Sequence, residues 1–132
     1  MDALTVGVWK LIRGLDAKLK VLNSGATNLK VTVSVLRNKD YSADFRFCGD
    51  NNWWLRSPQR NYRVEDPSLD YLLEKYARLM DPDFNKNVGD HALYDTEEDY
   101  VKASQRYVQS NRDKFLQGFI GCLEKVVNSL KS

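Results

Sequence analysis

Two runs of alternating apolar and polar residues constrain the fold of this chain most strongly. The first covers residues 29–36 and the second covers residues 41–48. Alternation with period two is typical of a β-strand with one buried and one solvent-facing side. The polar residues 38–40 suit a hairpin loop, so we expect the two strands to pair antiparallel. The apolar set is Leu29, Val31, Val33 and Val35 in the first run and Tyr41, Ala43, Phe45 and Phe47 in the second.

A third strand is expected directly after this hairpin. Residues 49–52 read Gly-Asp-Asn-Asn, which is turn chemistry, and residues 53–56 read Trp-Trp-Leu-Arg. Aromatic residues favour strands, and a short turn places consecutive strands side by side. The sequence therefore predicts a three-stranded antiparallel β-meander, with residues 57–65 as a loop.

Helical periodicity flanks this sheet on both sides. Residues 2–22 carry apolar residues at steps of three and four, which is the spacing of one helical face. A second helix is expected over residues 66–80, with Asp66 as N-cap and Pro67 at its first position. An acidic loop then leads to Thr96, which resembles the start of a capping box, and the helical pattern from there runs nearly to the C-terminus. The polar residues 109–111 are expected to bend or divide this last helix.

The predicted fold class is α+β. It consists of an N-terminal helix, a three-stranded antiparallel β-meander, and two or three C-terminal helices packed on one face of the sheet. With 132 residues and 42% hydrophobic residues, the chain is long and apolar enough for a single domain over residues 1–132.

Composition also bears on location and oxidation state. Six charged residues interrupt the first 22 positions, which excludes the apolar core of a signal peptide or a membrane span there. The chain has two cysteines, Cys48 and Cys122, and no N-glycosylation acceptor. We therefore expect reduced thiols and a soluble, cytoplasmic protein that does not act on membranes.

Charge is unevenly distributed along the chain. Residues 1–63 hold eleven Lys or Arg against five Asp or Glu, whereas residues 64–132 hold nine against thirteen. The total of +2 is modest, below the strongly basic charge usual for a dedicated nucleic-acid domain.

No known catalytic or cofactor motif is present in the sequence. It has no Gly-rich phosphate loop, nucleophile elbow, paired histidines on one helical face, or Cys-x-x-Cys. With His91 as the single histidine and two distant cysteines, a closed zinc site cannot be completed from His and Cys alone. We predict no cofactor, no metal and no catalytic residue. A small enzyme that uses carboxylates or His91 stays open as an alternative.

The most distinctive local feature is a segment rich in tryptophan and arginine. No acidic residue lies between Asp50 and Glu65. Adjacent strand residues point to opposite faces, so one tryptophan enters the core while its neighbour stays outside with the arginines. In the alternative, helices cover both rings and the arginines are merely solvated. The candidate binding residues are Trp53, Trp54, Arg56, Arg60, Tyr62 and Arg63, together with Arg46 and Lys39 from the preceding strands.

These observations favour a non-enzymatic interaction protein, a small regulator or inhibitor. It would bind a protein partner through the Trp/Arg segment or through the acidic residues 81–99. The alternative is binding of nucleic acid, a nucleotide or another phosphate ligand by the basic sheet region, with an exposed tryptophan stacking on a base. Phe45 and Phe47 weigh against the latter, because they are expected in the core rather than on the open face. The apolar stripe of the last helix, with Gly118 and Gly121, suggests a homodimer.

Overall fold

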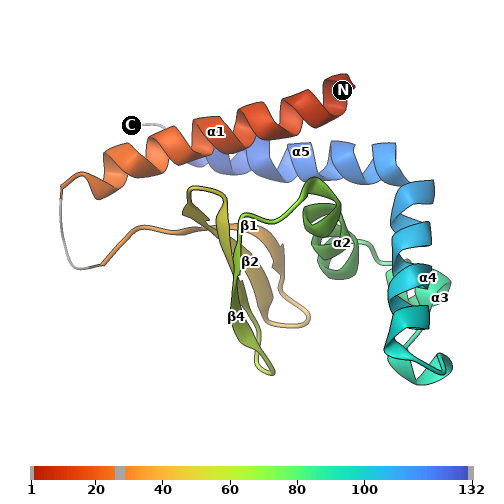
Figure 1. Cartoon of the computed structure of the whole chain (residues 1–132). Coiled ribbons are helices and arrows are strands. Elements are labelled where there is room, and N and C mark those ends of the chain that lie inside the picture. The colour runs from red at the N-terminus through yellow and green to blue at the C-terminus, as the bar shows by residue number, and fades with distance from the viewer. Residues whose placement is uncertain (1, 26–28, 131–132) are drawn as a thin grey trace.

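The computed structural model describes residues 2–25 and 29–130 and has the predicted α+β architecture (Figure 1). The helix α1 (Ala3–Asn23) is followed by four strands, β1 (Val33–Asn38), β2 (Ala43–Gly49), β3 (Asn52–Arg56) and β4 (Asn61–Glu65). The helices α2 (Leu69–Met80), α3 (Phe84–Val88), α4 (Glu97–Ser110) and α5 (Arg112–Ser129) complete the chain, with the short 3-10 helix η1 (His91–Leu93) before α4.

The sheet has four strands rather than the three that the sequence predicts. Their order is β1-β2-β3-β4, and every neighbouring pair is antiparallel. The additional strand β4 lies in the segment predicted as a loop. Asn, Arg and Glu occupy alternate positions of β4 and are not typical strand residues, so the sequence does not mark this segment as a strand. It is a strand because its backbone pairs with β3, which places Val64 beside Trp53 and Tyr62 beside Leu55.

A bulge interrupts the predicted alternation in β1. The register shifts between Ser34 and Leu36, so that Val35 and Leu36 are both buried. Three predicted core positions lie outside the strands instead, since Leu29 is 84% exposed, Tyr41 is 63% exposed and Val31 is 39% exposed. The pattern therefore identified the hairpin but misplaced its ends.

The core forms between one face of the sheet and the helices. Trp53 is fully buried at its centre, with its ring stacked on Phe45 at 4.9 Å and beside Phe47 and Phe119. The indole N–H of Trp53 donates to the side chain of Asn51 at 2.9 Å, so its burial leaves no polar group without a partner. The helices α1 and α5 lie side by side above the sheet (Figure 1).

The start of α2 differs from the prediction. Its N-cap is Ser68, whose hydroxyl accepts from the backbone N–H of Tyr71 at 3.2 Å. Asp66 has a φ of 48°, a left-handed conformation that an N-cap does not adopt. The predicted acidic loop also contains α3 and η1. The division at Asn111 into α4 and α5 confirms the prediction for the last helix.

The apolar stripe of α5 is buried within the same chain. Phe115, Leu116, Phe119 and Leu123 all belong to the core, so the stripe by itself no longer argues for a homodimer. At Gly118 a Cβ atom would lie 2.0 Å from the hydroxyl oxygen of Tyr76, so this glycine lets the Tyr76 side chain of α2 approach α5 closely within the same chain. None of the helices within residues 2–25 and 29–130 is long and apolar enough to cross a membrane.

Candidate binding site on the open sheet face

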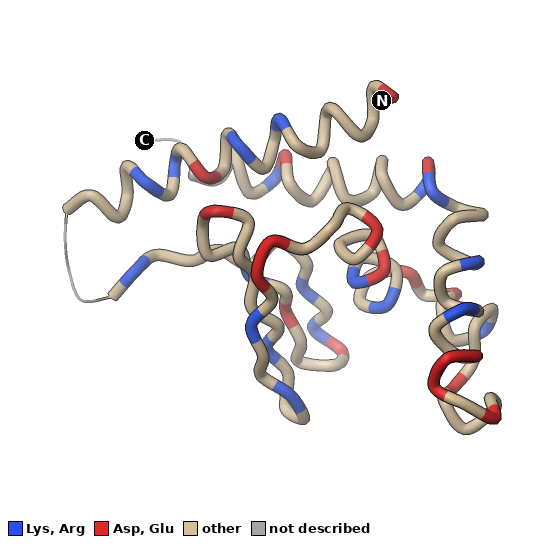
Figure 2. Tube along the Cα trace, in the orientation of Figure 1, with Lys and Arg blue, Asp and Glu red and all other residues tan. Residues whose placement is uncertain are grey.

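The face of the sheet opposite the helices carries two rows of polar and basic residues. Basic residues follow its strands, whereas acidic ones gather around α3, η1 and the start of α4 (Figure 2). Cross-strand pairing aligns each row over the four strands. The first row is Ser34, Arg46, Trp54 and Arg63, and the second is Arg37, Asp44, Arg56 and Asn61.

Trp54 is the one aromatic residue of the first row, and it is partly exposed. Its neighbour Trp53 points into the core, as alternation in a strand requires. Trp54 is not among the partly buried apolar residues that pack against the core. It lies between Arg46 on β2 and Arg63 on β4. Of the two adjacent tryptophans, Trp54 is therefore the one on the open face.

Arg46 is held in place by three hydrogen bonds. It donates from Nη1 to the carboxylate of Asp44 at 3.0 Å, from Nε to the hydroxyl of Thr32 at 3.0 Å, and from Nη2 to the carbonyl of Thr32 at 3.2 Å. Asp44 and Arg46 form an ion pair in which both side chains are largely covered. Arg46 therefore forms a fixed wall beside Trp54 rather than a free cation.

Other basic groups on this face are free to meet an anion. The ion pairs of residues 2–25 and 29–130 do not include Arg37, Lys39, Arg56 or Arg63. Arg37 was not among the predicted site residues, because the first strand was expected to end at residue 36. A charged residue directly after an alternating run was the signal that could have revealed it.

A hollow of about 720 Å³ opens on the same face, and its lining includes Arg46, the cross-strand neighbour of Trp54. Four cations line it against the single carboxylate of Asp44, and several hydroxyl and amide groups complete its wall. The charged lining residues are Arg37, Lys39, Asp44, Arg46 and Arg56. This composition suits an anion with several oxygen acceptors.

Tyr62 and Arg60 lie away from this hollow. Tyr62 pairs with Leu55 on the helix side of the sheet, where its hydroxyl is 3.4 Å from that of Tyr71. Burial opposes ionisation of Tyr62, but the adjacent Lys75 and other donors outweigh it and lower the pKa of Tyr62. Arg60 ends the β3–β4 turn and is exposed. Of the predicted residues, the open face therefore combines Trp54, Arg56, Arg63, Arg46 and Lys39.

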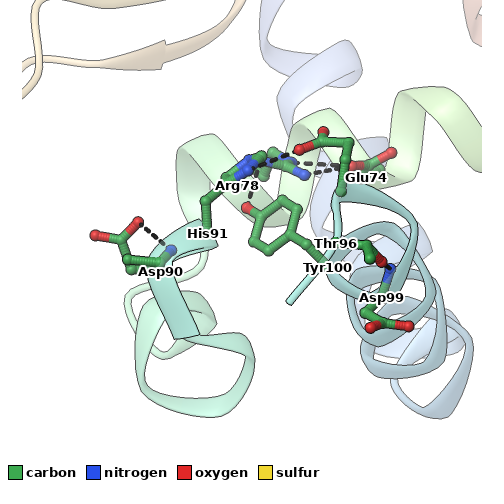
Figure 3. A network of polar contacts seen from close by, with 9 residues as sticks. Glu74, Arg78, Asp90, His91, Thr96, Asp99 and Tyr100 are labelled. Carbon is green, nitrogen blue, oxygen red and sulfur yellow. Dashed lines mark hydrogen bonds and ion pairs between the residues drawn. The ribbon is translucent and has the colours of Figure 1, made fainter. Parts of the chain in front are cut away.

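His91 belongs to a different polar cluster, between α2 and α4 (Figure 3). Its Nδ1 lies 2.9 Å from the carboxylate of Glu97, and its ring packs on Tyr100 at 3.7 Å between centroids. The Tyr100 hydroxyl accepts from Arg78 at 2.6 Å, and Arg78 is paired with Glu74. These groups satisfy one another, which is the pattern of a structural network that holds η1 against α2 and α4.

The two thiols are partly buried, and their surroundings disfavour the reactive thiolate form. Burial raises the pKa of Cys48, and the nearby charges of Arg63 and Arg46 oppose this shift only in part. Burial likewise raises the pKa of Cys122, so both thiols are poor nucleophiles near neutral pH. Among residues 2–25 and 29–130, no three His, Cys, Asp or Glu side chains gather closely enough to hold a metal ion.

Comparison with known proteins adds no relative to this picture. No family model matches the chain, and neither a curated protein nor a solved structure is significantly similar to it.

Proposed function

We propose that this protein is a non-enzymatic binding protein whose open sheet face holds single-stranded nucleic acid. The observation that carries the proposal is the position of Trp54, partly exposed on a middle strand between Arg46 and Arg63. An unpaired base stacks on the indole, while neighbouring phosphates meet arginine. Such stacking is sequence-tolerant, because every base has a flat π-face.

The charge of the sheet region supports an anionic ligand. Residues 29–63 contain seven Lys or Arg against three Asp or Glu. The carboxylate of Asp44 on the open face is already paired with Arg46. Arg56 and Arg63 are left to neutralise phosphates, and each lies close to Trp54. Arg63 is its cross-strand partner, about 5 Å away between backbones, and Arg56 is two residues along β3, about 7 Å away.

The arrangement favours a single strand over a duplex. A base must leave its helical stack before its flat side can contact a tryptophan on a sheet. Duplex DNA is usually read by an element that enters the major groove, most often a helix. The helices that form the core of this protein lie on the other side of the sheet (Figure 1).

An acidic segment of a protein partner is the second candidate ligand. Tryptophan and arginine are among the residues enriched in the hot spots of protein interfaces, and Trp54 and Arg63 present both types side by side. This candidate predicts that oligonucleotides do not bind the open face, whereas acidic peptides do.

A labelled oligonucleotide titration tests the proposal. We expect eight-residue single strands to raise fluorescence anisotropy saturably, and Trp54→Ala to weaken binding by about 1–3 kcal/mol, roughly 5- to 150-fold. Arg63→Ala should reduce the slope of log K against log salt by about 0.7, the share of one phosphate contact in a single strand.

Two control variants separate local contacts from general charge. Arg106 is exposed on α4, so Arg106→Ala removes the same charge as Arg63→Ala away from the sheet and should leave binding nearly unchanged. Trp9 is the other partly exposed tryptophan, and because it lies on α1, away from the open sheet face, Trp9→Phe should leave the affinity for the oligonucleotide unchanged. Equal weakening by Arg63→Ala and Arg106→Ala would contradict the proposed site.

A further inference from the structure

The hollow on the open face lies at the end of the sheet where two turns contribute to its lining. Residues of the β1–β2 turn, among them Lys39 and Ser42, line it together with Ser57 at the end of β3. Both turns lie at the same end of the antiparallel sheet. A nucleic acid that runs along the sheet past Trp54 therefore meets the two turns at the hollow. This position suits the end of a nucleic-acid strand better than its middle.

The charge in the hollow exceeds what one phosphate diester needs. Four cations face one carboxylate, and that carboxylate is engaged by Arg46. Arg37, Lys39 and Arg56 have no ion-pair partner within the described part of the chain. A diester carries a single negative charge, whereas a phosphate monoester carries about −1.5 to −2 near pH 7 and offers three terminal oxygens. The three unpaired cations of the hollow therefore suit the higher charge and the three terminal oxygens of a phosphate monoester.

The spacing links this hollow to the proposed stacking site. Arg56 lines the hollow and points to the same face as Trp54, because the two residues are two positions apart on β3. Arg46, the cross-strand partner of Trp54, lines it as well. A nucleotide whose base stacks on Trp54 can thus place its phosphate near these cations.

From this geometry we propose that the hollow binds a terminal phosphate monoester of a single-stranded nucleic acid, with the terminal base on Trp54. The inference rests on the proposed function and deepens it, since it makes phosphorylated strand ends the preferred ligand. Arg37 and Lys39 act on the terminal phosphate, and Arg56 connects the two parts of the site.

Competition among three forms of one oligonucleotide tests the inference. The strand carries a 5′-phosphate, a 3′-phosphate, or hydroxyl groups at both ends, and each form displaces a labelled strand at about 0.15 M salt. We expect one phosphorylated form to bind at least about tenfold more tightly than the hydroxyl form, the gain of one added charge-assisted hydrogen bond. Equal binding of all three forms overturns the inference while leaving the proposed function intact. Binding of none of them refutes the proposed function itself.

Protein variants then locate the preference. Arg37→Ala and, separately, Lys39→Ala should reduce the ratio of the dissociation constants for the hydroxyl and phosphorylated forms to about threefold or less, because each removes a cation that faces the monoester. Arg106→Ala on α4 should keep the full ratio. Both Arg37 and Lys39 are exposed, so these variants should fold. An unchanged ratio in both variants would show that the terminal phosphate binds elsewhere and would overturn the assignment of the hollow.

Discussion

Replacing Gly118 by alanine should destabilise the protein, although alanine is the better helix former. The substitution adds a Cβ atom 2.0 Å from the Tyr76 hydroxyl oxygen and 2.5 Å from its ring carbon Cζ. Tyr76 cannot easily move aside, because its ring packs against Phe115 and Phe119 at 5.9 and 6.4 Å between centroids. Overpacking of this kind costs about 1–3 kcal/mol.

The higher helix propensity of alanine opposes this cost. A second glycine on the same helix, Gly121, allows the gain from propensity to be measured separately. Alanine in place of glycine inside a helix gains about 1 kcal/mol. A Cβ at Gly121 would meet nothing within 4 Å, so Gly121→Ala should show the gain alone. The difference between the two variants removes the propensity term and leaves the clash, about 1–3 kcal/mol.

Urea unfolding of both variants is the assay, because a domain of this size is expected to unfold in one cooperative step. We expect the midpoint to fall for Gly118→Ala relative to Gly121→Ala. Combining Gly118→Ala with Tyr76→Leu should recover part of the loss, since the removed ring is the group in contact. If both glycine variants raised the midpoint equally, the packing of α5 against Tyr76 described above would be refuted.

Two further outcomes follow from the core and its ionisable groups. Trp53→Ala should lower the free energy of unfolding by about 3–5 kcal/mol and Trp54→Ala by less than about 1 kcal/mol; similar losses in urea unfolding would contradict the assignment of their faces. Burial, and donation of its phenolic proton to Asp81 at 2.5 Å, raise the pKa of Tyr107 to about 12. Because the pKa of Tyr107 is higher in the folded than in the unfolded protein, its protonated hydroxyl stabilises the folded state at pH values below the unfolded pKa of about 10. This stabilisation is lost as the pH rises towards 12. Tyr107→Phe should therefore lose less stability than the native protein between about pH 9 and pH 12, and an equal loss would exclude this role for Tyr107.

Local patterns in the sequence determined most of the secondary structure. The spacing of apolar residues predicts α1 closely, and its N-cap Asp2 accepts from the backbone of Thr5 at 2.8 Å. Alternation predicts the β1–β2 hairpin and the buried side of Phe45 and Phe47, which are fully covered. These features depend on neighbours a few residues apart, so the sequence carries them directly.

The features that the sequence missed depend on contacts between distant segments. The strand β4 exists because its backbone pairs with β3, and the bulge in β1 depends on which residues the core can accept. The left-handed Asp66, with its backbone N–H bonded to the carbonyl of Asn51, moves the start of α2 to Ser68. No local pattern encodes such pairings.

The candidate site is divided in the same way. Alternation along a strand predicts that the paired tryptophans point to opposite faces, but the sequence by itself left open whether helices cover both rings. Only the tertiary structure decided that Trp54 is the exposed one, since helices cover just one face of the sheet. It also decided that Arg37 and Lys39 of the first hairpin share a hollow with Arg56, because β2 pairs with both β1 and β3 and aligns Arg37, Asp44 and Arg56 in one row across the sheet.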